Sequence, residues 1–373
     1  MHRFWLSFIL ILAAVGVGEL AIGVPTSATA RAKQAATAKQ APPKKAASPG
    51  TLQTVVAAAN ALVATLDEAQ KAKTLFPFDS PQKTNWSNLP SGIYPRNSLK
   101  LGDITPAQRD AVMKLMAAVL SREGYQKINE IIEADEVLKI QGGGRTGGRP
   151  GAAPKAGGRG GGVIFGKDEY FIALLGAPST TTPWMIQFGG HHLAINVTIV
   201  GAQSVMTPSL PAAQPAHYTL DGRSIRPLGD ENDKGFALIN ALNAAQQEQA
   251  ILKSEVRDLV LGATQDGKTI QPEGILATSL TPAQQNLLLD LAHEWVGILN
   301  DEAAAARMAD IRANLAKTYF AWSGSTTNGT RAYYRIQGPT VHIEFAHQQN
   351  DLEHIHTIYR DPTNDYGSSL VKK

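Results

Sequence analysis

The chain has 373 residues, no cysteine and a formal net charge of +3. Without cysteine it has neither disulfides nor thiolate metal sites, and its hydrophobic core alone must hold the fold together. The positive charge is concentrated in two low-complexity segments, 31–50 and 141–162, which together contain nine Lys and Arg residues and no acid, so the rest of the chain carries −6. A nucleic-acid-binding protein presents a basic folded surface. We therefore expect no nucleic-acid partner.

Residues 1–30 have the pattern of a secretory signal peptide. His2 and Arg3 precede an apolar run over residues 4–18, and Ala28-Thr29-Ala30 offers a small-x-small cleavage site. The run is shorter than the roughly twenty apolar residues that cross a membrane. We expect a secreted or periplasmic protein with no stable membrane span after cleavage, and the alternative is an uncleaved anchor.

The composition then predicts the domain organisation. Residues 31–50 contain Ala, Lys and Pro but no large apolar side chain, which is typical of a disordered linker. The Gly- and Arg-rich segment 141–162 predicts a flexible insertion. The remainder, 51–373, is expected to be a single globular domain made of two repeats, 51–226 and 227–373.

The first evidence for a repeat is a pair of similar helix starts. DITPAQRDAVMKLMAAVL (103–120) is similar to SLTPAQQNLLLDLAHEWVGIL (279–299). In both segments Thr precedes Pro and Ala-Gln, and apolar residues follow at helical spacing. Thr105 and Thr281 are therefore predicted N-caps, with proline at the first helical position.

The second evidence lies downstream, where 169–199 is similar to 317–345. Both segments run from Tyr-Phe through small residues and a Ser/Thr cluster to alternating apolar residues, the pattern of a β-hairpin. The predicted helices are 51–74, 106–121, 124–140, 231–259, 282–300 and 302–316. The predicted strands are 170–175, 184–190, 192–200, 203–207, 318–323, 331–337, 340–346 and 354–360. The expected fold class is α+β: two repeated helix–hairpin units pack their helices around a mixed or antiparallel sheet.

Histidines and carboxylates concentrate in two of these strand segments. QFGGHHLAIN contains His191 and His192, and VHIEFAHQQNDLEHIHTIYRDPTNDYG contains Glu344, His354 and His356. Imidazole and carboxylate are the ligands of divalent metal ions in cysteine-free sites. These five residues are therefore the candidate metal ligands.

Strand geometry suggests how these residues meet. Side chains alternate with a period of two, so His354 and His356 point to one face of a strand, whereas His191 and His192 point to opposite faces and one of them is expected at the site. A hairpin between the last two predicted strands brings Glu344 near the pair. A ligand imidazole needs an acceptor for its second nitrogen. The candidates for this role are Asp361, Asp365 and Gln187.

The motifs FGGHHLAIN, TPxQ, YYRIxGPxxxIEF and HIHTIYRDPTNDYG resemble those of the DUF3500 family, and the resemblance covers roughly residues 51–373. It implies an exported protein, because members of this family are exported bacterial and fungal proteins of uncharacterised function. The family often has Asn before HIH, where this chain has Glu353. The resemblance implies no reaction.

The residue types leave two classes of function open. The first is an exported metal-dependent hydrolase or oxidoreductase that uses a divalent ion such as zinc, iron or copper, with Glu344, Arg360 and Asp361 as candidate catalytic residues. Glu344 would form a general acid/base pair with a histidine, and Arg360 would hold an anionic group. The second is a non-catalytic envelope or secreted protein that binds a metal or a small ligand. The ligand itself, a small molecule, peptide or carbohydrate, is not specified by these residues.

Overall fold

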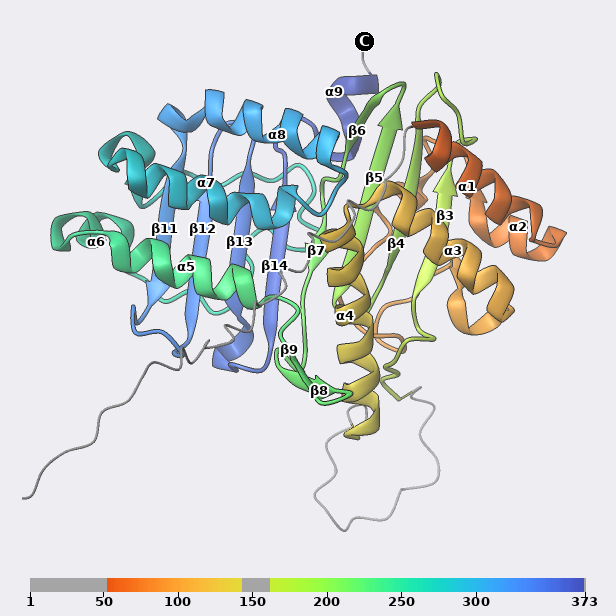
Figure 1. Ribbon diagram of the computed structural model, residues 1–373, viewed down its shortest axis with the longest axis horizontal. Coiled ribbons are helices and arrows are strands. Elements are labelled where there is room, and N and C mark those ends of the chain that lie inside the picture. The colour runs from red at the N-terminus through yellow and green to blue at the C-terminus, as the bar shows by residue number, and fades with distance from the viewer. Residues whose placement is uncertain (1–51, 143–161, 372–373) are drawn as a thin grey trace, which may run out of the picture. The chain divides into compact units, whose positions relative to one another are not determined.

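A computed structural model describes residues 52–142 and 162–371, and Figure 1 shows that they form a mixed α+β fold. The predicted signal peptide and linker, and nearly all of the Gly- and Arg-rich insertion, lie outside the described residues. Among the helices of the described part, none is both long and apolar enough to cross a membrane.

The described part of the N-terminal half contains one sheet and four α-helices. Its sheet has the strand order β1-β3-β4-β5-β6, with β2 paired to β3 and β7 paired to β5, and only the β1–β3 pair in this sheet is parallel. The strands are β1 (Leu75–Phe76), β2 (Leu99–Lys100), β3 (Phe171–Leu175), β4 (Trp184–Gly190), β5 (Leu193–Val200), β6 (Gln203–Val205) and β7 (Leu210–Pro211). The helices are α1 (Leu52–Ala64), α2 (Glu68–Thr74), α3 (Pro106–Val119) and α4 (Arg122–Ile140).

The C-terminal half contains a second, antiparallel sheet with the order β10-β11-β12-β13-β14. Its strands are β10 (Ile275–Leu276), β11 (Tyr319–Gly324), β12 (Ala332–Gln337), β13 (His342–His347) and β14 (Ile355–Arg360). The helices are α5 (Gly229–Ala241), α6 (Ala244–Ala250), α7 (Pro282–Val296), α8 (Asp301–Ala313) and the short α9 (Ser368–Val371). A small hairpin of β8 (Tyr218–Leu220) and β9 (Arg223–Ile225) lies between the two halves in the chain.

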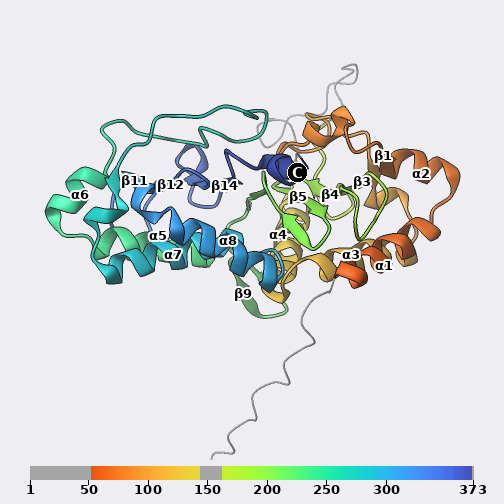
Figure 2. The same ribbon diagram turned by 90° about the horizontal axis from the view of Figure 1, so that it is seen from above.

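A short segment around β7 joins the two sheets. On one side β7 pairs with β5, and on the other side Ser209 and Ala213 form bridges to Tyr359 and Ile355 of β14. Figure 2 shows α1, α3, α5, α7 and α8 on one side of the strands and long loops on the other.

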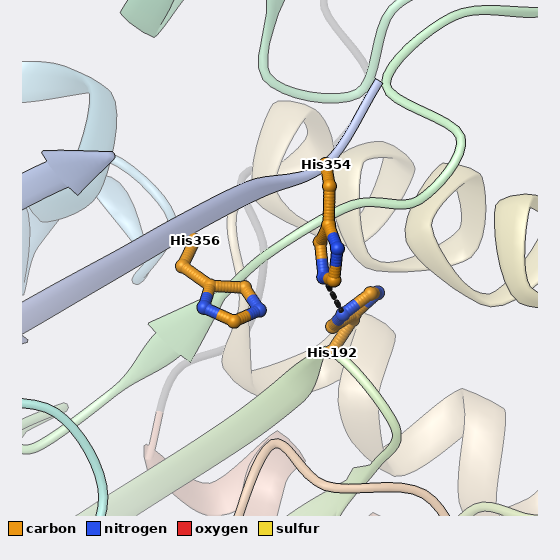
Figure 3. Close-up of side chains that lie close together, drawn as sticks. All are labelled: His192, His354 and His356. Carbon is orange, nitrogen blue, oxygen red and sulfur yellow. Dashed lines mark hydrogen bonds between the residues drawn. The ribbon is translucent and has the colours of Figure 1, made fainter. Parts of the chain in front are cut away.

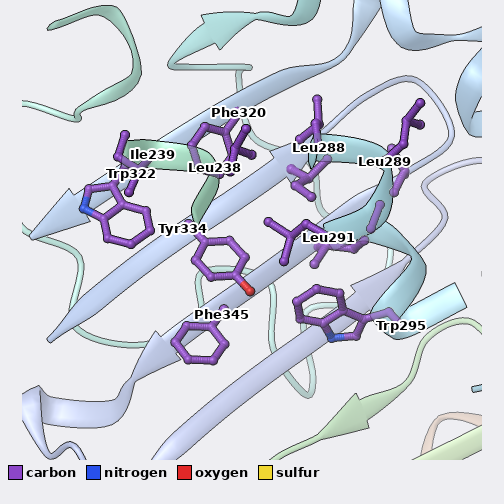
Figure 4. Packing of buried hydrophobic residues seen from close by; sticks show 14 of the residues in the cluster. Leu238, Ile239, Leu288, Leu289, Leu291, Trp295, Phe320, Trp322, Tyr334 and Phe345 are labelled. Carbon is purple, nitrogen blue, oxygen red and sulfur yellow. The ribbon is translucent and has the colours of Figure 1, made fainter. Parts of the chain in front are cut away.

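Alternation along the strands gives the second sheet an apolar and a polar face. Tyr334 and Phe345 lie on the apolar face, where their rings stack with centroids 4.9 Å apart. They pack among buried residues of α5 and α7 such as Ile239 and Trp295 (Figure 4). On the opposite face, β13 presents His342 and Glu344 to the loops. Burying such polar groups is tolerated only when each finds a hydrogen-bond partner.

The predicted N-caps at Thr105 and Thr281 are confirmed. Thr105 forms a capping box with Gln108, and the Gln108 amide also donates to Thr65 O at 2.8 Å and to Gln70 Oε1 at 2.8 Å. These bonds attach the start of α3 to the end of α1 and to α2.

The C-terminal half repeats this network. Thr281 forms a capping box with Gln284, whose amide donates to Ala241 O at 2.7 Å and to Gln246 Oε1 at 2.9 Å. The start of α7 is thereby attached to α5 and α6, just as the start of α3 is attached to α1 and α2.

Two predicted helices were too long. The segment 51–74 forms two helices because Asp67 caps a new one, with its side chain accepting from Gln70 N. The segment 231–259 likewise divides where Asn243 caps α6, and the helix ends at Ala250. Beyond that point Leu252 N donates to Trp322 O of the second sheet, so tertiary pairing replaces the helical bond.

Candidate metal centre

The site begins at the tight turn between β4 and β5, which consists of His191 and His192 between the paired residues Gly190 and Leu193. His192 has φ 60°, in the left-handed region. That conformation costs about 1–2 kcal/mol for a residue other than glycine, and such strain is concentrated at functional sites. The turn therefore holds a histidine where glycine would be preferred.

The strained turn brings His192 to His354 and His356. One ligand atom from each of these three residues, here called the histidine triad, lies within 4.8 Å of the others. His354 directly precedes β14 and His356 is its second residue, so both side chains project from the same face (Figure 3). His192 Nε2 and His354 Nε2 are 2.9 Å apart. The triad thus combines one histidine from the N-terminal half with two from the C-terminal half.

The surroundings keep two of these rings uncharged. His192 is 2% exposed, and His354 is partly buried. Burial, together with the neighbouring histidines, holds the pKa of His192 well below its usual value. Burial and the proximity of His356 and His191 lower the pKa of His354 to about 4. The lone pairs of His192 and His354 are therefore available near neutral pH, as metal coordination requires.

The Asp258 carboxylate orients the His356 ring from the side opposite the triad. Asp258 Oδ1 lies 2.9 Å from His356 Nδ1, which leaves the Nε2 side of that ring facing the triad and Asn88 Nδ2, 3.5 Å away. Burial alone would raise the pKa of Asp258, but the hydrogen bond and proximity of His356 and the backbone amide of Leu259 outweigh it, and the pKa is lowered. A carboxylate that accepts from the second nitrogen of a ligand histidine is typical of metal sites.

A second carboxylate supports the triad indirectly. Asp135 of α4 lies 2.6 Å from His191 Nδ1, and the His191 ring stacks on His192 with centroids 3.6 Å apart. Burial lowers the pKa of His191 although Asp135 opposes the shift. Of the two turn histidines, His192 belongs to the triad and His191 packs behind it.

Glu344 lies outside the triad. The register of β13 and β14 pairs Ala346 with His356, whereas Glu344 is two residues further along and pairs with Ile358. Its carboxylate accepts from Val260 N, Leu261 N, Tyr333 and His342 at 2.7–2.9 Å. The structure therefore does not bring this predicted ligand together with the three histidines.

Arg360 and Asp361 also serve other partners. Arg360 binds Asp266 and Asp365 and donates to two loop carbonyls, Leu261 O and Gly262 O. Asp361 pairs with Arg307 of α8 at 3.0 Å.

The other expected supporting residues also bind elsewhere. Gln187 is bound to Asn196 and to the 82–83 segment. Glu353, which replaces the family's frequent Asn, accepts from His217 N at 3.2 Å.

The supporting residues Asn88, Asp135 and Asp258 were not predicted from the sequence. Asp135 and Asp258 fell in predicted helices, and Asn88 in a segment without a motif. Asn88 and Asp258 are separated from His356 by 268 and 98 residues along the chain. The turn that contains His192 did carry a local sequence signal, because a non-glycine residue in a two-residue hairpin turn is unusual.

The triad fits a divalent metal ion. It offers three imidazoles whose ligand atoms lie within 4.8 Å of one another, with a carboxylate behind the His356 ring. Two nitrogens bound to one tetrahedral zinc ion lie about 3.3 Å apart for bonds of about 2.0–2.1 Å. To admit an ion, the 2.9 Å between His192 and His354 would open slightly, and the wider separations within the triad, which are up to 4.8 Å, would close.

Comparison with known proteins places the chain in a family. Residues 49–368 match the family model DUF3500, described as a protein of unknown function. The chain belongs to the DUF3500 family. The match covers nearly the whole chain and confirms the resemblance noted in the motifs. No curated protein and no solved structure matches the chain, so the residues of this DUF3500 member must themselves indicate its chemistry.

Proposed function

We propose that this DUF3500 protein is an exported metal-binding protein whose centre is the histidine triad, and that the bound ion serves a hydrolase or an oxidoreductase reaction. The single observation that carries the proposal is the convergence of His192, His354 and His356 within 4.8 Å. Two of these histidines stay neutral near pH 7, and a carboxylate orients the third.

Three protein ligands leave room for a further ligand on the ion, which is typical of catalytic rather than structural zinc sites. A divalent ion in such a site would act as a Lewis acid towards a substrate oxygen or, if it is iron or copper, as a redox centre. The chain's own residues would hold and orient the ion. Asp258 would fix the tautomer of His356, and the Asn88 amide would face the ion or its substrate.

A non-catalytic metal- or ligand-binding protein is the second candidate. It is favoured by the burial of the centre, since His192 is 2% exposed and His356 is 7% exposed. A site with two of its three ligands buried and His354 partly buried suits storage or structural stabilisation. Solvent access to the ion distinguishes the two candidates.

We also propose that the two halves arose by duplication. The matching networks around Gln108 and Gln284 support this, as do two further correspondences. β2 pairs antiparallel with β3 as β10 does with β11, and the parallel pair β1–β3 matches the parallel bridge between Ile251 and Trp322. Export is supported by the signal-peptide pattern of residues 1–30.

Elemental analysis of the purified protein tests the metal proposal. The wild type is expected to contain about one equivalent of a transition metal or zinc, and His356→Ala is expected to lose it because a third of the ligand set is gone. His293→Ala is the matched control, since it removes an exposed helical histidine of α7. Full metal content in His356→Ala, or none in the wild type after reconstitution, would contradict the proposal.

A further inference from the structure

One loop segment, 258–262, runs along the polar face of the second sheet and ends at the triad. At one end Asp258 holds His356 Nδ1 at 2.9 Å. At the other end Arg360 donates to Leu261 O and Gly262 O, each at 2.7 Å. The position of Asp258 therefore depends on how this short segment is attached to β13 and β14.

Glu344 attaches the middle of the segment. Its two carboxylate oxygens accept from Val260 N at 2.7 Å and Leu261 N at 2.8 Å. Tyr333 and His342 hold the same carboxylate from the sheet side at 2.9 and 2.8 Å. The side chain is 0% exposed. A buried carboxylate is tolerated when donors surround it in this way, and here two donors belong to the loop that carries Asp258.

In the N-terminal half, the loop that contains residues 82 and 83 is attached to the first sheet at an equivalent position. Gln187 and Asn196 are cross-strand partners on β4 and β5, as Arg335 and Glu344 are on β12 and β13. The Gln187 amide donates to Gln82 O at 3.1 Å and to Lys83 O at 3.2 Å.

The loop held by Gln187 leads to Asn88. The Asn88 carbonyl accepts from His192 N at 3.1 Å, and its amide lies 3.5 Å from His356 Nε2. Two equivalent cross-strand pairs, Gln187–Asn196 in the first sheet and Arg335–Glu344 in the second, thus each contribute a side chain that holds one of the two loops that reach His356.

We infer that Glu344 is a positioning residue, which fixes the 258–262 segment so that Asp258 orients the imidazole of His356 in the metal centre. The inference rests on the proposed function and deepens it. Glu344 acts through the loop backbone and does not touch the bound ion. Its effect on the ion must therefore pass through Asp258.

A double-mutant cycle tests this dependence. The zinc dissociation constant is measured for the wild type, Glu344→Gln, Asp258→Asn and the double variant, together with hydrogen exchange at the amides of residues 260 and 261. Glu344→Gln keeps the size of the side chain but loses one acceptor. Each single variant is expected to weaken zinc binding about 10–100-fold, the range for groups that orient a ligand. The double variant should bind no more weakly than Asp258→Asn alone, and Glu344→Gln should speed exchange at both amides.

The control is Glu231→Gln, which alters another 0% exposed carboxylate that bonds to Lys127 on the helix side. The inference would be overturned if Glu344→Gln bound zinc as tightly as this control. It would also be overturned if the losses of zinc affinity in the two single variants added up in the double variant. Tyr333→Phe removes one donor to Glu344 and should give a smaller loss of the same kind if Glu344→Gln fails to fold. If the wild type binds no zinc, the proposed function is contradicted instead. In that case, unchanged hydrogen exchange at the amides of residues 260 and 261 in Glu344→Gln would still refute the positioning role.

Discussion

At the residue scale, His192 combines a strained backbone with a buried, uncharged ring. Its φ is 60° and its Nδ1 lacks a partner among the described residues. Both features oppose stability of the metal-free protein. The proposed role of His192 in the triad would account for a residue that does not favour folding.

This leads to a prediction for His192→Asn. Asparagine tolerates the left-handed conformation, so the backbone is expected to be unchanged, and the loss of the buried ring and of its bond to His354 is expected to lower the free energy of unfolding of the metal-free protein by about 1–3 kcal/mol. Metal content should be lost because one of three ligands is gone. Urea denaturation and elemental analysis measure the two effects. Retained metal would remove His192 from the centre.

The lowered pKa of His354 predicts a dependence of stability on pH. The folded-state pKa is about 4, whereas an unfolded histidine titrates near 6.5. Between these values the unfolded chain binds a proton that the folded protein does not, so stability is lost as the pH falls from about 6.5 towards about 4. The lowered pKa of His192 acts in the same direction. The decline is at most about 1.4 kcal/mol per pH unit for each residue.

Urea titrations of the metal-free protein between pH 7 and pH 4.5 measure this decline. The variant His354→Asn is expected to lose less stability over that range because it removes one of the titrating groups. His293→Ala should follow the wild type. Equal slopes for the wild type and His354→Asn would show that His354 titrates normally.

The sequence predicted the residues of the site better than their partners. The spacing of His354 and His356 is local, and a period of two suffices to place both on one face. Glu344 was expected beside them, but the register of β13 and β14 places it next to Ile358. Asp258 and Asn88 reach His356 through loop paths that no local pattern encodes.

At the element scale, the matching caps support the two-repeat proposal and predict equal costs in the two halves. Gln108→Ala and Gln284→Ala each remove the buried amide that joins three helices. Each is expected to destabilise the protein by about 1–3 kcal/mol, because carbonyls and a cap nitrogen lose their partners. Chemical denaturation measures both variants against the exposed control Gln126→Ala. A cost in one half alone would argue against equivalent units.

Strand positions were predicted closely because buried strands alternate or run apolar between clear turns. The predicted 354–360 is observed as β14 (Ile355–Arg360), and 184–190 as β4 (Trp184–Gly190). The helix expected through 251–259 is absent from the described structure. Its sequence has helical periodicity, but pairing of Leu252 with Trp322 overrides local preference.

At the scale of the whole molecule, the two halves make close backbone contact at the start of α4. Ser121 at the start of α4 donates to Gly297 O at 2.6 Å and to Ile298 O at 3.0 Å through its side chain and backbone. A Cβ added at Gly124 would lie 2.2 Å from Ile298 O. The halves therefore meet backbone to backbone at this point, as they do between residues 209–213 and β14.

We predict a single cooperative unfolding transition and a large effect of Gly124→Ala. The added methyl group must displace the Ile298 backbone, and overpacking of this kind costs about 1–3 kcal/mol. Far- and near-ultraviolet circular dichroism during urea unfolding should give coincident curves for the wild type. Two separate transitions would show that the halves fold independently.

Anomalous diffraction from crystals of the reconstituted protein tests the central claim most directly. The account predicts one anomalous peak about 2.0–2.2 Å from a ring nitrogen of each of His192, His354 and His356, with Asp258 still bonded to His356. A peak elsewhere, or an empty triad in crystals grown with saturating metal, would contradict it.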